Sequence, residues 1–495
     1  MSLKRFLKSI ILIFIPSISS EPSEPNESTG KLSSSYIKKL VKKDVEEIRR
    51  AKFKKLAKRW RSRLKNFHLL IIVAALAVRK IFRPIFSYID SKIFERKLHV
   101  RKTQLKSHYF SNKIKFETLL PSVSVVINTK NSPPFFKEIL QKYKNQIGFK
   151  KIEIIIVDSG STDDTLKLAK YYGCKIIEIK PEEFRHGRSR NIGIEVATGK
   201  YIVNAVSDAT PSTLDLLAKV ASKLESREAG AVSVRQIPRM DADIFAAWNI
   251  WYHYQSLFKG SLQDVWVSDV RNFKSLSNWQ KRKLTILDDV FILHKASVIK
   301  KNKYNPDIRF AEDIELSIRY IEKGIKIGFL NSECIIHSHN RNLEYVFKRY
   351  FVDSNVLYDY LNILQTNLKK FRVSSDTKDV YSTLNSLLGM VEKKLSEVGS
   401  ETEWVKRHQE FFEKESVMDE IAVRMWKKIF RNLKLDFRRF VDLSTIDVKQ
   451  SRELESKIAA LTSAILLAEF LLRLPTDIKN IPDLQRFKAY VEKGV

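Results

Sequence analysis

The segment IIIVDSGSTDDT, residues 154–165, joins a run of β-branched residues to a turn rich in Gly, Ser and Asp. The run is typical of a buried strand, and the turn offers residues that cap the first turn of a helix. Similar β-rich runs alternate with helical stretches around it, and the predicted strands are 122–128, 152–157, 175–179, 201–205 and 231–235. This alternation predicts an α/β fold with a mostly parallel sheet.

Polar residues follow the first two predicted strands, where a parallel sheet binds its ligands. Thr129 lies at the end of the first strand and Asp158 at the end of the second. Asp158 could accept hydrogen bonds from a base or a ribose. Helix capping alone would explain Ser161, Thr162 and Asp163.

Three motifs in order resemble the inverting family 2 glycosyltransferases, which have a nucleotide-sugar-binding domain of the GT-A fold. The motifs are VSVVINTKN (123–131), the segment 154–165 and HGRSRNIGIEVATGKYIVNAVSDATP (186–211). The resemblance implies that a nucleotide sugar is the donor substrate. It also implies that the nucleotide pocket is lined by Thr129, Asp158 and Asp163, and that Arg190 and Asn191 approach the donor.

The metal motif of that family, Asp-x-Asp, reads Val206-Ser207-Asp208 here, so one carboxylate remains. The resemblance makes Asp208 the predicted ligand of a divalent metal, Mg²⁺ or Mn²⁺, because such hard cations suit carboxylate and phosphate oxygens. A rhamnosyltransferase-like subset shares the F-x-H-G-x-x-R-N pattern at 184–191 and the S-D-A-T-P pattern at 207–211. Its G-R-Q segment matches Arg235-Gln236, which we therefore place at the donor site.

Two downstream motifs complete the predicted site. FAEDIEL, residues 310–316, resembles the Glu-Asp motif of the family, and an inverting transfer needs a carboxylate to take the acceptor's proton. Asp313 is the candidate base, whereas Glu312 and Glu315 fit acids at a helix N-terminus. CIIHSHN, residues 334–340, alternates like a strand and places His337 and His339 on one side. We expect one of them to contact metal or diphosphate, and the spacing leaves open which.

Composition indicates a globular chain of more than one structural unit. The 495 residues are 44% hydrophobic and include 14 Gly and 13 Pro, which excludes collagen-like and low-complexity classes. Cys174 and Cys334 are the only cysteines, so a disulfide framework or a thiolate zinc site is not indicated. The formal net charge of +32 favours anionic partners, namely anionic lipid, nucleic acid or nucleotide diphosphates.

Patterning divides the chain into four predicted regions: a flexible leader at 1–35, a basic amphipathic region at 36–110, a GT-A domain at 119–340 and a helical domain at 341–495. The start resembles a secretory signal, but Pro16 interrupts its apolar run. The apolar segment 69–78 is too short to cross a bilayer. We therefore expect a cytoplasmic protein held peripherally on an anionic membrane surface.

The sequence thus predicts a metal-dependent glycosyltransferase that acts with inversion, in surface glycan or glycolipid synthesis. The acceptor hydroxyl could belong to a glycan, a lipid-linked intermediate or a soluble molecule. Two alternatives stay open: a nucleic-acid-binding protein, suggested by the charge without a recognised binding module, and a catalytically inactive membrane-bound scaffold, suggested by Val206. The aromatic segment 241–259 fits sugar stacking, membrane contact or core packing equally well.

Overall fold

The structure is a computed structural model that describes residues 118–268, 270, 273–365, 376–396, 418–440 and 448–493. These residues belong to one compact unit, Pro84–Val495. The predicted leader at 1–35 and basic region at 36–110 lie outside the described residues. None of the helices within the described ranges combines the length and apolar character needed to cross a membrane.

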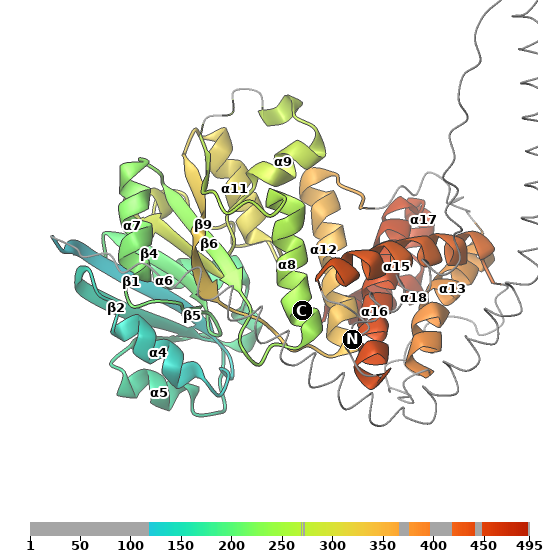
Figure 1. Cartoon of the computed structure of the whole chain (residues 1–495), viewed down its shortest axis with the longest axis horizontal. Coiled ribbons are helices and arrows are strands. Elements are labelled where there is room, and N and C mark those ends of the chain that lie inside the picture. The colour runs from blue at the N-terminus through green and yellow to red at the C-terminus, as the bar shows by residue number, and fades with distance from the viewer. Residues whose placement is uncertain are drawn as a thin grey trace, which may run out of the picture. The chain divides into compact units, whose positions relative to one another are not determined.

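The first part of the described chain is a nine-stranded sheet with the strand order β3-β2-β1-β4-β8-β6-β9-β5, in which β7 also pairs with β9. The strands are β1 (Leu120–Thr129), β2 (Phe149–Asp158), β3 (Lys175–Glu178), β4 (Tyr201–Val206), β5 (Thr210–Pro211), β6 (Ala231–Ile237), β7 (Val265–Val267), β8 (Phe291–Lys295) and β9 (Ile327–Ile336). The predicted α/β class is confirmed, and the five predicted strands correspond to β1, β2, β3, β4 and β6. Figure 1 shows this sheet with helices on both sides.

The second half of the sheet is more mixed than the first. β3, β2, β1 and β4 are parallel neighbours, and β6 is parallel to β9. β8 lies antiparallel between β4 and β6, and β5 and β7 are antiparallel to β9. The carboxyl ends of β1, β2, β4, β6 and β9 therefore point toward one edge, where the predicted site residues follow.

Helices cover both faces of the sheet, and each face has its own apolar core. One face packs against α4 (Phe136–Lys144), α5 (Thr165–Tyr171) and α7 (Leu216–Ser226). The other packs against α6 (His186–Val196), α10 (Ala296–Ile299) and α11 (Glu312–Glu322). Gly193 lets α6 approach β1, because a Cβ there would lie 2.3 Å from a methyl carbon of Val126.

A third core joins the sheet domain to the helices that follow it. α8 (Ile244–Phe258) and α12 (Leu343–Leu361) pack with α13 (Thr377–Ser396), α15 (Glu420–Phe440), α16 (Val448–Arg473) and α18 (Pro482–Glu492); the short α17 (Thr476–Lys479) precedes α18 (Figure 1). Trp248 of α8 is fully buried, with its ring 5.6 Å from that of Phe437. Core packing therefore accounts for Trp248 in the aromatic segment. The predicted boundary at 340 falls between β9 and α12, and this apolar core continues across it.

Candidate active site

Asp208 and two histidines form a cluster at the carboxyl edge of the sheet. Asp208 follows β4, and His337 and His339 follow β9. The Asp208 carboxylate lies 3.4 Å from His337 Nε2 and 3.0 Å from His339 Nδ1. One ligand atom from each residue fits within 4.8 Å of the others, so the three could hold a metal ion. The predicted metal residues are therefore brought together, and both histidines, not one, face Asp208.

Gln236 at the end of β6 fixes the orientation of His337. Its amide Nε2 donates to Asp288 Oδ2 at 2.6 Å, which turns its Oε1 toward His337 Nδ1 at 2.8 Å. Because Oε1 only accepts, Nδ1 must carry the proton, and Nε2 then presents a lone pair to Asp208.

The donor set of this cluster, two imidazoles and a carboxylate, fits a divalent cation. Although burial opposes ionisation, the neighbouring His337 and His339 hold the pKa of Asp208 well below its ordinary value. Burial, together with the charge of His337, lowers the pKa of His339 to about 4. The ionised carboxylate is the form of Asp208 that binds a metal.

Asp313 lies in the first turn of helix α11, and the residue is partly exposed whereas its neighbour Glu312 is buried. It accepts from the backbone N–H of Ile314 at 2.8 Å and from that of Asp289 at 3.5 Å. Burial and the nearby carboxylates of Glu312 and Asp288 raise the pKa of Asp313 to about 6. A carboxylate with such a pKa can accept a proton near neutral pH.

Arg190 lies in a buried ionic cluster and not on the surface of the site. Its guanidinium pairs with Glu312 and lies 3.3 Å from the Asp289 carboxylate, and only 4% of the residue is exposed. It also lies 5.6 Å from the centre of the Tyr304 ring, whose hydroxyl donates to Asp289 at 2.8 Å. Although burial favours the neutral acid, Arg190 holds the pKa of Glu312 below its ordinary value. The contacts of Arg190 thus hold the first residue of α11, Glu312, in place. Its approach to a donor stays a prediction.

Asn191 is also bonded to another segment of the chain, the backbone of Tyr304. Its side-chain amide donates to the carbonyl of Tyr304 at 2.8 Å and accepts from the N–H of Tyr304 at 3.0 Å. This two-way bond fixes the backbone that presents the Tyr304 ring. The approach of Asn191 to a donor stays a prediction.

Asp158 shapes the loop after β2. Its carboxylate accepts from Thr129 Oγ1 at 2.7 Å, from the N–H groups of Gly160 and Ser161, and from Ser161 Oγ. These donors account for the acceptor capacity of a carboxylate, and Gly160 adopts a φ of 91° that favours glycine. Thr129 and Asp158 are thus hydrogen-bonded to each other. Their contact with a nucleotide stays a prediction.

Asp163 and Arg235 contact other residues than those of the metal cluster and the candidate base. Asp163 is exposed and accepts from the N–H of Thr165, the first residue of α5, at 3.0 Å, whereas the N-cap residue of that helix is Asp164. Arg235 donates to Asn331 Oδ1 at 2.6 Å and lies 4.6 Å from the centre of the Tyr254 ring. Arg235 therefore braces β6 against β9, next to Gln236.

Residues that the motifs did not select also border the site. Asp288 joins Gln236 to the carboxylates around Asp313. Arg349 of α12 pairs with Asp353 at 3.0 Å, and its charge acts on both His339 and Asp313. The contact of Gln236 with Asp288 and the effect of Arg349 on Asp313 join segments far apart in the sequence, which no local motif signals.

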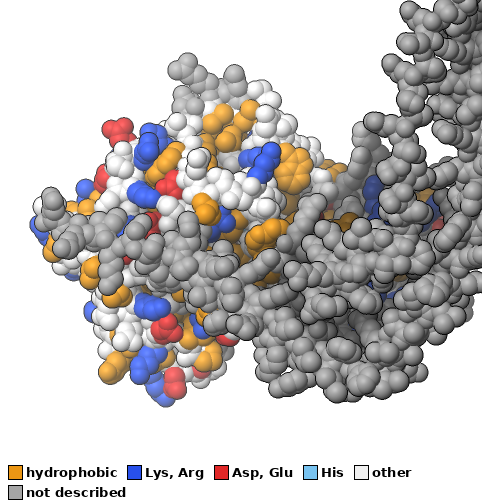
Figure 2. Space-filling view, in the orientation of Figure 1, with side chains coloured by type: hydrophobic (Ala, Val, Ile, Leu, Met, Phe, Trp, Pro, Cys, Tyr) orange, Lys and Arg blue, Asp and Glu red, His pale blue; other side chains and the backbone are white. Residues whose placement is uncertain are grey.

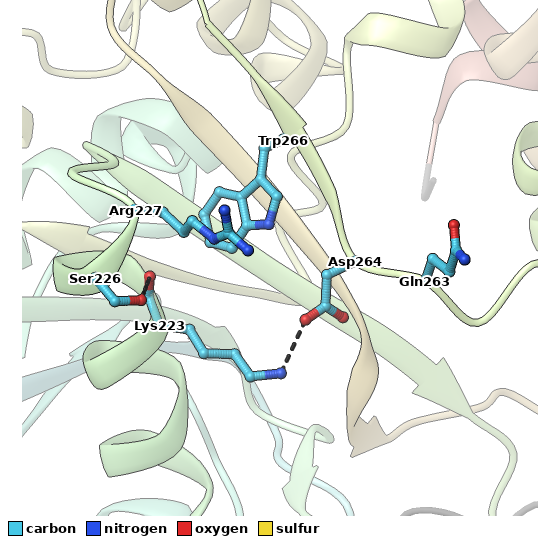
Figure 3. A pocket seen from close by; sticks show the side chains of 6 residues that line it. All are labelled: Lys223, Ser226, Arg227, Gln263, Asp264 and Trp266. Carbon is cyan, nitrogen blue, oxygen red and sulfur yellow. Dashed lines mark hydrogen bonds and ion pairs between the residues drawn. The ribbon is translucent and has the colours of Figure 1, made fainter.

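The structure also contains a pocket of about 420 Å³ that none of the predicted site residues lines. Figure 3 shows its lining, in which Lys223 pairs with Asp264 at 2.8 Å beside the ring of Trp266. The remaining lining residues are Ser226, Arg227 and Gln263. The metal cluster and Asp313 therefore do not line this pocket.

Comparison with known proteins identifies relatives of the sheet domain. The sequence profile described as "Glycosyl transferase family 2" matches residues 124–301. The chain is 30% identical over 240 residues to the O-antigen chain rhamnosyltransferase WbaN of Salmonella anatum, covering 47% of this chain and 71% of that protein. It is 25% identical over 234 residues to the O-antigen chain rhamnosyltransferase RfbN of Salmonella typhimurium, covering 46% and 70%.

Among solved structures, S. aureus TarS is similar at a TM-score of 0.37 with 17% identity, over 56% of this chain and 85% of that one. A mannosyltransferase from Pyrobaculum calidifontis, solved with GDP-Man and Mn²⁺, has the same TM-score and identity, over 54% and 74%. The sequence matches are the decisive finding, because they span the strand-end motifs and most of the relative's length. The chain belongs to glycosyl transferase family 2.

Proposed function

We propose that this glycosyltransferase moves a sugar from a nucleoside-diphosphate sugar to an acceptor hydroxyl with inversion of the anomeric centre. The observation that carries the proposal is the link between two clusters at one sheet edge. The cation-binding cluster of Asp208, His337 and His339 connects through Gln236 and Asp288 to the neighbourhood of Asp313. Such a pair of centres suits a reaction that separates a diphosphate leaving group from a hydroxyl nucleophile.

The base in this proposal is Asp313. Its carboxylate takes the proton of the acceptor hydroxyl while that oxygen forms the new bond to the anomeric carbon. The bond from the anomeric carbon to the diphosphate oxygen breaks on the opposite side, which inverts the configuration. Glu312 and Asp289 are weaker candidates because both face Arg190 in the buried cluster.

Asp208, His337 and His339 would hold a divalent cation, which would supply counter-charge to the diphosphate as it leaves. Two imidazoles and one carboxylate favour Mn²⁺ over Mg²⁺, since Mg²⁺ prefers an all-oxygen shell. Gln236 Oε1 lies 2.8 Å from His337 Nδ1 and so orients the His337 ring for this role.

The names of the relatives WbaN and RfbN support a role in surface glycan synthesis. A glycan or lipid-linked acceptor fits this role, and we place the protein on the cytoplasmic face of the membrane, where nucleotide sugars are available. An inactive scaffold remains the second candidate because Val206 replaces the first metal-motif Asp. Hydrolysis or transfer of a donor sugar by the purified protein would eliminate that candidate.

The deciding experiment compares Asp208→Asn with Asp313→Asn in one assay. Purified protein is screened with UDP-, GDP- and dTDP-sugars, with and without Mn²⁺, and release of nucleoside diphosphate is measured. Asp208→Asn should weaken Mn²⁺-dependent donor binding and abolish both transfer and slow donor hydrolysis. Asp313→Asn should keep the donor affinity and lose turnover by roughly 10²- to 10⁴-fold.

Two outcomes would contradict these roles. A normal Mn²⁺ response in Asp208→Asn would remove the metal assignment. Near-normal transfer by Asp313→Asn would move the base to another carboxylate, with Glu312 or Asp289 next. Exposed Asp307 supplies a matched Asp→Asn control that should change neither measurement.

A further inference from the structure

Helix α9 (Asn278–Leu284) and the short helical turn before it, Phe273–Ser275, form a basic surface with an exposed tryptophan. Trp279 is 51% exposed. Lys274 and Lys283 are exposed, and Lys281 is partly exposed. We call these four residues the α9 surface. Figure 2 shows hydrophobic and basic side chains beside one another in this region, which Figure 1 labels α9.

The charge of the α9 surface is not neutralised locally. Residues 270–287 contain five basic side chains and no acidic one. Within the described part of the chain, no ion pair is recorded for Lys274, Lys281 or Lys283. The Lys281 amine lies 5.9 Å from the centre of the Phe273 ring, which is a contact that leaves its charge available. An indole among uncompensated lysines has the composition of a surface that contacts anionic lipid.

The position of α9 relative to the base gives this surface a functional context. Arg282 lies on the same helix, and its charge acts on the carboxylates of Asp313 and Asp288. The side chain of Asn278, at the other end of the helix, donates to the carbonyl of Asn362 after α12 at 2.9 Å. The exposed Trp279 therefore lies one helical turn from Arg282, whose charge acts on the candidate base.

We propose that the α9 surface contacts the anionic headgroups of a membrane. Trp279 lies at the level of the headgroups, and the three lysines face lipid phosphates. A lipid-anchored acceptor then reaches Asp313 without leaving the bilayer surface, and this last step rests on the proposed function. A nucleic acid is the rival occupant, but the single exposed ring of α9 offers no series of platforms for successive bases.

The test measures contact between Trp279 and lipid directly in the full-length protein. Vesicles of equal parts phosphatidylglycerol and phosphatidylcholine carry brominated acyl chains, which quench tryptophan fluorescence on contact. All other tryptophans are shared between wild type and Trp279→Phe, so the difference in quenching isolates Trp279. We expect Trp279→Phe to lose a quenched component that wild type shows, and vesicles of phosphatidylcholine alone to produce no such component.

Two further variants make the test specific. Lys281→Glu combined with Lys283→Glu should reduce quenching to the level of Trp279→Phe, and the corresponding Lys→Arg pair should restore it. Trp266→Phe is the matched control, because Trp266 packs against Gly328 in a different part of the sheet domain, and its quenched component should equal that of wild type.

The proposal is overturned if wild type and Trp279→Phe are quenched equally while both sediment with the vesicles, or if neither binds them. It is also overturned if duplex DNA changes the Trp279 component more than vesicles do. Since the readout is lipid contact and not sugar transfer, its failure leaves the proposed function intact. Inactivity of a protein that shows the contact would count against the proposed function alone.

Discussion

At the scale of single residues, the acidity of Asp313 gives the proposed reaction a pH dependence. Burial and the carboxylates of Glu312 and Asp288 raise the pKa of Asp313 to about 6, and a base must be ionised to accept a proton. Activity should therefore fall as pH drops through that value and level off above it. The measurement is kcat/KM for the donor against pH, with donor affinity measured in parallel. A profile without an inflection near this pKa would argue against Asp313 as the base.

Gln236 provides a second prediction because it contacts the metal cluster only through His337. Gln236→Leu removes the acceptor that keeps the His337 proton on Nδ1 and the donor to Asp288. Loss of such a partner typically weakens metal affinity by about 10- to 100-fold. Titration with Mn²⁺, followed by the electron paramagnetic resonance of the free ion, measures the change. Gln263→Leu, on an exposed loop, is the control and should retain the wild-type affinity.

Arg190 distinguishes a supporting role from a donor contact. Arg190→Met leaves the buried carboxylates of Asp289 and Glu312 without their cation, and breaking a buried pair in this way costs about 3–5 kcal/mol. Denaturant unfolding should show this loss, whereas Arg188→Met at an exposed position of α6 should leave stability unchanged. Unchanged stability combined with weaker donor binding would instead favour the donor contact that the sequence motif implies.

At the scale of elements, α8 connects the sheet domain to the C-terminal helices through its buried aromatic side chains. Trp248 is fully buried and packs on Phe245, Tyr252 and Phe437. Trp248→Ala should therefore lower the free energy of unfolding by about 3–5 kcal/mol. Thermal and denaturant unfolding measure the loss, and Trp279→Ala, which truncates an exposed ring, should lose much less. Equal effects of the two substitutions would contradict this account of the core.

The strands that could be predicted are those whose pattern is local. β1, β2 and β4 are rich in β-branched residues and end in polar motifs, so both the strands and the positions of Thr129, Asp158 and Asp208 follow from the sequence. β8 was not among the predicted strands, because its antiparallel insertion between β4 and β6 depends on partners far away in the chain. The same limit applies to its neighbour Asp289, which meets Arg190 only in the folded chain.

The candidate site shows the same division. Asp208, His337 and His339 were predicted together from motifs, and the structure brings them into one cluster. The roles of Arg190 and Asn191 were assigned by resemblance, yet a motif does not say whether a polar side chain faces a ligand or another segment. In this fold their partners are Glu312 and the backbone of Tyr304. Such contacts depend on the packing of α6 and α11, which the sequence alone does not provide.

At the scale of the whole molecule, the net charge of +32 predicts how the full-length chain should behave on lipid. Lys and Arg near an anionic surface contribute about 1 kcal/mol each. The predicted basic region at 36–110 and the α9 surface both contribute to this positive charge. Full-length protein should therefore sediment with vesicles that contain phosphatidylglycerol and remain in solution with phosphatidylcholine alone.

Salt decides whether that binding is peripheral. The Debye length shrinks from about 8 Å at physiological ionic strength to about 3 Å at 1 M, so an attachment that depends on surface charge weakens sharply. Salt should therefore release most of the sedimented protein, whereas an apolar insertion would resist it. Protein that stays fully bound through high-salt and carbonate washes would contradict the peripheral interpretation. Tighter binding to duplex DNA than to vesicles at equal salt would instead favour the nucleic-acid alternative, because polyanion binding by counterion release has the same salt dependence but needs no lipid.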